Sequence, residues 1–240
     1  MRDNRLACRR RRATALYTSV LAALGLTTDA VADGIGFVVQ SASDTIYHGT
    51  PETGGEPFLA TTLTWQATDL FFAGASARVS PVPNQRQRHH SYDLFAGTSL
   101  AIDSNWLTTF SAVRREFPGS QKAWQYTEYR LELAHERGFQ VRLEYAPDYY
   151  AHKTEATVLE LRNTHFLGRH SYWQIGAGGV ALSRKNLPDY YYAELGVGVS
   201  SARWTLDVSY GWNSEDGSDL FGGPPIRSPG VVFSVAYRAL

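Results

Sequence analysis

Sulfur is scarce in this sequence, whose 240 residues include one cysteine and one methionine. The cysteine, Cys8, lies near the N-terminus, ahead of the first apolar stretch. A disulfide within the chain is therefore excluded, and residues beyond Cys8 offer no thiol nucleophile. The folded protein must be stabilised by other means.

Long apolar runs and a net charge are also missing. No window holds the roughly 18 apolar residues that a membrane-spanning helix needs, and the mean hydropathy is −0.29. The 23 basic and 23 acidic residues balance, but six arginines lie within residues 1–32, so 17 basic and 21 acidic residues remain beyond them. This acidic excess argues against nucleic acid as a partner, because phosphate contacts need a basic face.

The N-terminus has the pattern of an export signal. Four arginines, Arg9 to Arg12, precede an apolar stretch from Ala13 to Leu26, and Ala30-Val31-Ala32 then supplies small residues at a cleavage site. The apolar stretch is too short to span a bilayer as a helix. We expect residues 1–32 to be a signal peptide and residues 33–240 to form one exported domain.

Alternation of apolar and polar residues dominates the remaining chain. From Trp204 to Trp212 every second residue is large and apolar, and Phe139 to Tyr145 repeats the pattern with charged residues between. A period of two places successive side chains on opposite faces of a strand. Twelve strands are predicted in this way, at residues 36–47, 57–66, 70–79, 91–102, 106–117, 124–136, 139–150, 155–166, 171–183, 191–200, 203–212 and 230–238.

Three features favour a membrane barrel over a soluble sheet. The runs reach about nine to twelve residues, whereas soluble strands average about five or six. Full charges occupy the middle of one strand face, where a dry protein core would cost several kcal/mol for each unpaired charge. Aromatic residues cluster near strand ends, as expected for interfacial girdles; they include Tyr92, Trp106, Trp124, Tyr145, Tyr149, Tyr150, Trp173, Tyr190, Tyr191, Tyr192, Trp204 and Trp212. A secreted soluble β-sandwich is the alternative that alternation alone leaves open.

Short motifs resemble a known family. The stretch Ser43 to Gly49 before a Gly/Pro turn, Phe117-Pro118-Gly119, Trp124 to Glu128, Tyr145 to Tyr150 and Val231 to Val235 resemble the TorF-type porin family of proteobacterial outer-membrane proteins. The chain departs from that pattern at His48 to Pro51, where the family usually has an arginine followed by Gly and a Ser-Gln pair. The resemblance implies an outer-membrane barrel that acts as a channel, and it supplies no catalytic residue.

Charged residues on the minor face of three neighbouring strands are the candidate lumen lining. They are Glu128, Arg130, Glu132, Arg142, Glu144, Glu160 and Arg162. Opposite charges that face each other would set up a transverse field across a narrow lumen, whereas ion pairs that fill the lumen would make a closed plug. Twelve strands give a barrel intermediate between filled and wide ones, so both arrangements stay open.

Enzyme-like and metal-like patterns are weak. His165 or His170 with Ser171 could serve a lipid hydrolase, although this spacing is more typical of a solvated loop. His89-His90 and the acidic residues Glu215, Asp216 and Asp219 match no recognised metal site. Gly176 to Gly179 lacks the lysine and helix of a phosphate loop, and small residues there favour a strand that makes room inside the barrel. We assign no catalytic residue, cofactor or metal.

The sequence therefore predicts an all-β protein, a transmembrane antiparallel up-and-down barrel of about 12 strands. Its expected location is the outer membrane of a Gram-negative envelope, and its expected role is passive diffusion of small hydrophilic solutes. Expected partners are outer-membrane lipids, lipopolysaccharide and the barrel-assembly machinery. The alternatives are a closed structural or lipid-modifying barrel and, less favoured, a soluble periplasmic β-sandwich that binds a ligand.

Overall fold

The computed structural model describes most of the chain beyond the N-terminal segment. The described residues are 34–52, 55–67, 70–80, 90–118, 124–151, 153–184, 187–215 and 230–239. The expected signal peptide, His89 and the loop acids Asp216 and Asp219 lie outside them.

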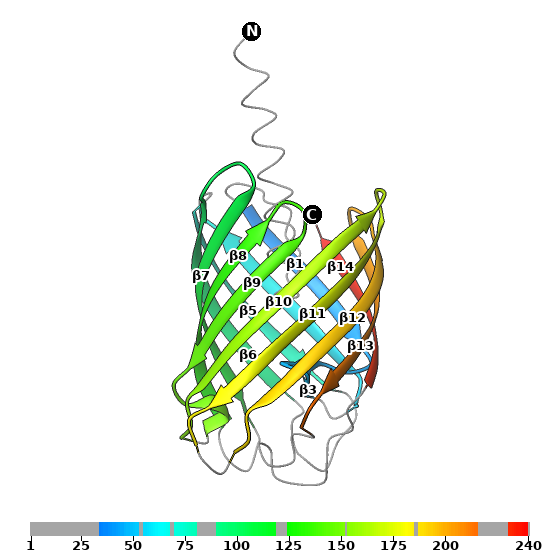
Figure 1. The fold of residues 1–240 in the computed structure, drawn as a ribbon. Coiled ribbons are helices and arrows are strands. Elements are labelled where there is room, and N and C mark those ends of the chain that lie inside the picture. The colour runs from blue at the N-terminus through cyan, green and yellow to red at the C-terminus, as the bar shows by residue number, and fades with distance from the viewer. Residues whose placement is uncertain are drawn as a thin grey trace.

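Twelve long strands form one closed antiparallel barrel (Figure 1). They are β1 (Gly34–Ala42), β4 (Phe58–Gln66), β5 (Phe71–Val79), β6 (His90–Ala101), β7 (Trp106–Phe117), β8 (Trp124–His135), β9 (Phe139–Ala146), β10 (Ala156–Leu167), β11 (Ser171–Leu182), β12 (Tyr190–Ser200), β13 (Trp204–Asn213) and β14 (Gly230–Ala239). Each pairs with its neighbours in sequence, and β1 also pairs with β14, with Phe37 opposite Ala239. The prediction of a twelve-strand antiparallel barrel is confirmed. Closure leaves no unpaired strand edge for hydrocarbon to meet.

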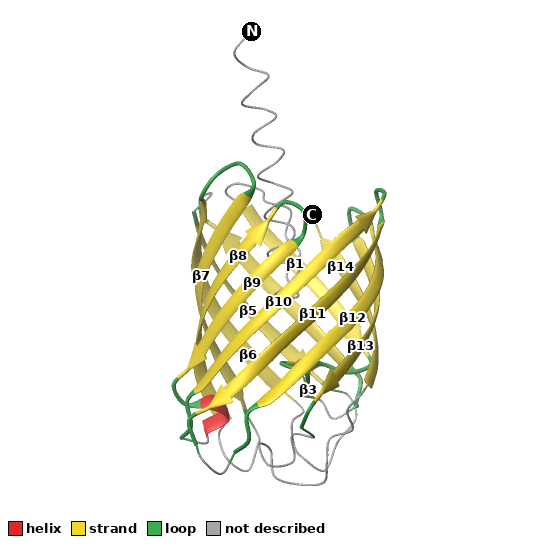
Figure 2. Ribbon diagram, viewed as in Figure 1, coloured by secondary structure: helices red, strands yellow, loops and turns green. Residues whose placement is uncertain are grey.

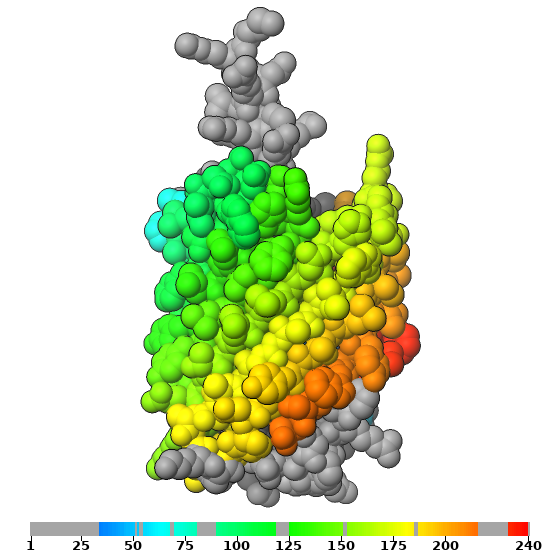
Figure 3. Space-filling view, viewed as in Figure 1, coloured from blue at the N-terminus to red at the C-terminus, as the bar shows by residue number. Residues whose placement is uncertain are grey.

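The outer face of the barrel is apolar. On β13, Trp204, Leu206, Val208, Tyr210 and Trp212 are all exposed, and the same holds for alternate residues of the other strands. Figure 3 shows one side of this outer wall, on which the side chains of successive strands form slanting bands. So large an exposed apolar area is unfavourable in water and suits a lipid-facing surface.

The two rims of the barrel differ in loop length. Turns at residues 67–70, 102–105, 136–138, 168–170 and 201–203 are short, and they lie at the rim where β1 begins and β14 ends (Figure 2). The connections at the other rim, such as residues 43–57 and 147–155, are longer. In the turn after β8, Gly138 has a φ of +90°, and a Cβ there would lie 1.9 Å from the carbonyl oxygen of Thr164, so only glycine fits.

Two predicted strands end earlier than expected because the chain turns into the barrel. The strand predicted at residues 36–47 stops at Ala42, and a small hairpin follows, made of β2 (Ile46–Tyr47) and β3 (Thr50–Pro51). His48 and Gly49, with φ values of 47° and 73°, form the tight turn between them. We call residues 44–52 the inner segment.

The strand predicted at residues 139–150 likewise stops early, at Ala146. A short 3₁₀ turn, η1 (Tyr149–Ala151), replaces its last part, and Tyr150 there has a positive φ of 51°. Among the described residues, no helix has the length and hydropathy needed to cross a membrane.

Candidate functional site

A cavity of about 510 Å³, lined by both polar and apolar side chains, occupies the inside of the barrel. Side chains from most of the twelve strands line it, together with part of the inner segment. Its lining includes both charged groups, such as Arg130 and Asp207, and aromatic rings, such as Phe95 and Tyr172. The cavity is the candidate functional site, because it is where a polar solute meets the protein away from lipid.

The seven charged residues expected in the lumen form a compact group on one wall. Strand register places Arg130 opposite Glu144 and Arg142 opposite both Glu132 and Glu160. Directly opposed residues of an antiparallel pair lie about 5 Å apart, so these charges meet as neighbours. Six of the seven are buried, namely Glu128, Arg130, Glu132, Arg142, Glu144 and Glu160.

Ion pairs link these charges along the wall. The Arg142 Nε lies 2.7 Å from a Glu144 oxygen, and its Nη2 lies 2.9 Å from Glu160. Arg162 extends the chain of pairs to Glu194 on β12, at 3.1 Å. The opposite charges therefore lie side by side on one wall, instead of facing each other across the lumen as a transverse field requires.

The inner segment crosses the lumen and docks against this wall. The Tyr47 hydroxyl bonds Glu128 and also lies 3.2 Å from Glu144. His48 Nε2 lies 2.9 Å from Glu144, and its Nδ1 lies 3.1 Å from the Tyr149 hydroxyl. On the far side of the lumen, the Asn213 amide on β13 donates to the carbonyl oxygen of Gly49 at 2.6 Å. The segment thus bridges two walls.

Glu52 anchors the end of the inner segment. Its carboxylate accepts bonds from Arg78 on β5 at 2.6 Å, from Arg115 on β7 at 3.2 Å and from the Tyr150 hydroxyl at 2.7 Å. Burial raises the pKa of Glu52, but the two arginines and the Tyr150 hydroxyl outweigh it and lower the pKa to about 2. The Arg115 guanidinium also stacks 3.9 Å from the centre of the Tyr47 ring.

Sequence reasoning missed Glu52, Arg78 and Arg115. Arg115 has the same parity as the buried Val113 and Phe117, so strand alternation did carry a signal for its inward position. Glu52 lies in a Gly/Pro-rich turn, which gave no sign that the segment folds inward.

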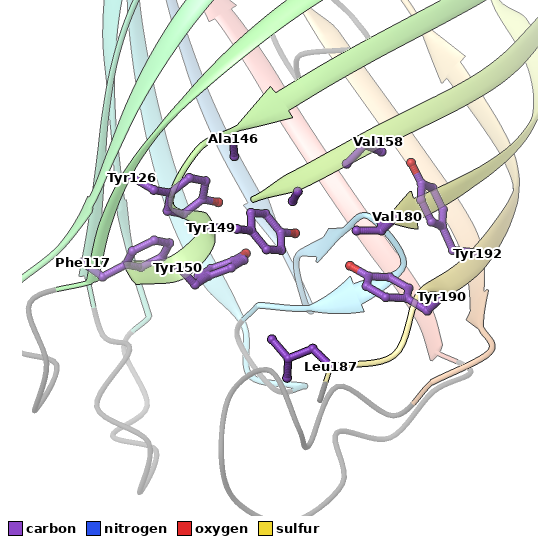
Figure 4. Packing of buried hydrophobic residues seen from close by; sticks show 11 residues of the cluster. Phe117, Tyr126, Ala146, Tyr149, Tyr150, Val158, Val180, Leu187, Tyr190 and Tyr192 are labelled. Carbon is purple, nitrogen blue, oxygen red and sulfur yellow. The ribbon is translucent and has the colours of Figure 1, made fainter. Parts of the chain in front are cut away.

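An aromatic cluster holds η1 beside the inner segment (Figure 4). Tyr149 and Tyr150 pack with ring centres 4.6 Å apart, and Tyr126 lies 4.8 Å from Tyr150. Tyr149, Tyr150, Tyr190 and Tyr192 are buried, so their assignment to the interfacial girdle is wrong. Tyr145 at the end of β9 and Tyr191, which lies between Tyr190 and Tyr192, are exposed on the outside. A run of adjacent tyrosines hides which parity faces inward.

The wall formed by β11, β12 and β13 is rich in glycine. A Cβ at Gly178 would lie 2.4 Å from the Tyr192 ring, and one at Gly198 would lie 2.5 Å from the Tyr172 ring. Each glycine therefore leaves room for a tyrosine of the neighbouring strand to lie across the wall. The glycines of residues 176–179 belong to β11, in keeping with their interpretation as a strand that makes space.

The candidate hydrolase residues are not brought together. His165 packs against Trp173, with ring centres 5.7 Å apart, and the exposed His170 contacts the Ser200 carbonyl. In the part of the chain that the structure describes, neither histidine bonds Ser171 or a carboxylate.

One group has metal-ligating atoms close together. His48, Glu128 and Glu144 place potential ligand atoms within 4.8 Å of one another. Both carboxylates already pair with arginines, Glu128 with Arg115 at 3.1 Å and Glu144 with Arg142 at 2.7 Å. A metal cation would have to displace these guanidinium groups, so the geometry favours a structural role.

Comparison with known proteins gives matches in structure alone. No protein family and no curated protein matches the sequence. Among solved structures, the KdgM porin aligns with a TM-score of 0.53 at 11% identity, covering 85% of this chain and 98% of that one. The NanC porin aligns with a TM-score of 0.55 at 8% identity, covering 84% and 98%.

These matches show the fold. The chain has the closed barrel architecture of outer-membrane porins. Identities this low carry no information about the solute, and the resemblance to the TorF-type family stays a prediction.

Proposed function

We propose that this protein is an outer-membrane channel for passive diffusion of small hydrophilic solutes. The observation that carries the proposal is a cavity of about 510 Å³, lined in part by charged side chains, inside a barrel whose outer face is apolar. Such a barrel exposes a hydrocarbon-compatible surface to lipid and a wettable surface to its lumen. The porin fold supports the proposal, since KdgM and NanC are porins.

The two rims suggest an orientation. Outer-membrane barrels have short periplasmic turns and longer extracellular loops. By this rule the short turns of the chain face the periplasm, and the inner segment enters the lumen from the outside. Outer-membrane lipids and lipopolysaccharide would contact the apolar wall, and the barrel-assembly machinery would insert it.

The inner segment makes a closed structural barrel the second candidate. It crosses the lumen from Glu144 on β9 to Asn213 on β13, which narrows any path through the barrel. In a channel the segment is the constriction that limits solute size; in a closed barrel it is the plug. A lipid-modifying activity finds no support in the positions of His165, His170 and Ser171.

Single-channel recording separates these candidates. The purified protein, inserted into a planar bilayer, is expected to give discrete current steps. A Glu52→Gln variant, which loses the charged anchor of the inner segment, is expected to give larger steps. A Glu116→Gln variant on the outer face is the control and should behave as wild type. A folded, inserted barrel that stays silent in all three forms would contradict the channel and support the plug.

A further inference from the structure

Asp207 on β13 differs from the paired carboxylates of the lumen. Its carboxylate accepts bonds from the hydroxyls of Tyr172 and Ser234. Among the described residues, no arginine, lysine or histidine lies within ion-pair distance of it; every lumen ion pair involves other acids. The charged group that does interact with it is Glu194, another carboxylate. A half-buried carboxylate without a counter-ion attracts a cation.

Two aromatic rings lie in line with Asp207. Strand register runs from Phe166 to Tyr172, from Tyr172 to Gly198 and from Gly198 to Asp207, so these residues form one row across β10 to β13. The rings of Phe166 and Tyr172 have centres 6.0 Å apart, and both line the cavity together with Asp207.

Gly198 makes the row possible. A Cβ at this position would lie 2.5 Å from both the Asp207 oxygen and the Tyr172 ring. The bare backbone of β12 therefore lets Tyr172 reach Asp207 on the next strand but one. Aromatic faces beside a carboxylate are the chemistry that recognises organic ammonium ions.

The charge of the whole lumen acts in the same direction. Among the described residues, eight carboxylates either line the cavity or form an ion pair with a charged residue that lines it. Six arginines line the cavity. The acids are Asp44, Glu52, Asp93, Glu128, Glu144, Glu160, Glu194 and Asp207, and the arginines are Arg78, Arg115, Arg130, Arg142, Arg162 and Arg238. An acidic excess raises the local concentration of cations in a confined space.

We propose that Phe166, Tyr172 and Asp207 form a binding site for a small organic ammonium ion on the lumen wall. The carboxylate supplies the countercharge, and the rings supply cation–π contacts to the alkyl ammonium group. The cavity of about 510 Å³ has the size of a small-molecule site. The proposal names a solute class for the proposed channel and rests on that function for transport, whereas binding requires only the folded barrel.

Binding is tested on the purified protein in detergent by calorimetric titration with tetramethylammonium chloride. Wild type is expected to bind saturably, and sodium chloride is expected to bind much more weakly. Asp207→Asn should weaken tetramethylammonium binding about tenfold, the effect of removing the countercharge from a cation–π site. Asp103→Asn, in an exposed periplasmic turn, is the matched control and should bind as wild type.

Two more variants separate recognition from folding. Phe166→Leu keeps every charge and should weaken tetramethylammonium binding severalfold, and Asp207→Glu should restore most of the binding that Asp207→Asn loses. The heat-dependent electrophoretic shift of folded barrels checks that each variant is folded. The proposed site would be overturned if wild type showed no saturable binding of tetramethylammonium, or if it bound sodium with equal affinity. It would also be overturned if Asp207→Asn and Phe166→Leu bound tetramethylammonium as tightly as wild type.

Reversal potentials in tetramethylammonium chloride gradients test the site in transport. Wild type is expected to prefer the cation, and Asp207→Asn should reduce the preference. Binding without current steps would overturn the channel and leave the site standing. Current steps without binding would overturn the site and leave the channel standing.

Discussion

The lumen of this barrel is filled in two different ways. On the wall from β7 to β10, guanidinium and carboxylate groups pair with one another and with the inner segment, as in the contacts of Arg142 with Glu144 and Glu160. On the wall from β11 to β13, glycines such as Gly178 and Gly198 leave room for tyrosines that lie across the neighbouring strand. In the first wall, charged groups hold the inner segment in place. In the second wall, glycines without side chains leave room for the tyrosine rings. The comparison indicates that the charged wall fixes the position of the inner segment, while the glycine wall determines the shape of the cavity.

The largest expected effect comes from breaking the charged wall at its centre. Glu144 contacts Arg130, Arg142 and His48. Glu144→Gln removes one partner from buried cations and should lower the free energy of unfolding by about 3–5 kcal/mol. Urea unfolding in detergent micelles measures this loss of unfolding free energy. Glu116→Gln, from the exposed pair with Arg114 at 3.6 Å, is the control and should cost less than about 1 kcal/mol. An equal loss of unfolding free energy in Glu144→Gln and Glu116→Gln would contradict the contrast between the lumen and the outer face.

The next effect depends on pH. Glu52 is buried, and its pKa falls from 4.5 to about 2. Because the pKa of Glu52 is lower in the folded state, its ionised carboxylate stabilises the fold fully above pH 4.5. This stabilisation is lost as the pH falls toward 2, which lowers the free energy of unfolding by about 3 kcal/mol. Unfolding free energies measured between pH 6 and pH 2 should show this loss for wild type. Glu52→Gln should lack this part of the pH dependence, and parallel curves for the two proteins would count against the anchor.

A smaller effect is expected on the glycine wall. In Gly178→Ala the new methyl group would meet the Tyr192 ring at 2.4 Å, so the ring must move and the overpacking should cost about 1–3 kcal/mol. Gly230→Ala on β14 is the matched control, because a Cβ there has no neighbour within 4 Å. The difference in unfolding free energy between the two variants measures how closely the tyrosines fit the wall. Equal unfolding free energies for the two variants would mean that the Tyr192 ring can move away from residue 178 at no cost in stability.

The strands could be predicted from sequence because their signal is local. Alternation between adjacent residues defined the outer face of β13 and brought Glu128 to Arg162 onto one wall. The inner segment could not be predicted, since the partners of Tyr47 and His48 lie far away in the sequence. Tyr47 bonds Glu128, 81 residues further along the chain, and His48 bonds Glu144, 96 residues along.

The buried tyrosines and the row from Phe166 to Asp207 show the same limit. In the run from Tyr190 to Tyr192, parity decides which ring is buried, and sequence did not reveal the parity. The alignment of Phe166, Tyr172 and Asp207 depends on the register between strands, which a single strand's pattern does not contain.

The position of the inner segment between β1 and β4 constrains how the molecule is built. β1 meets β14 at the seam of the barrel, and β4 pairs with the other edge of β1. Tyr47 and His48 are synthesised early, but the carboxylates that hold them belong to strands made much later. Because these partners lie 81 and 96 residues further along the chain, the segment can dock only once β8 and β9 are in place, so its docking is a late event in folding.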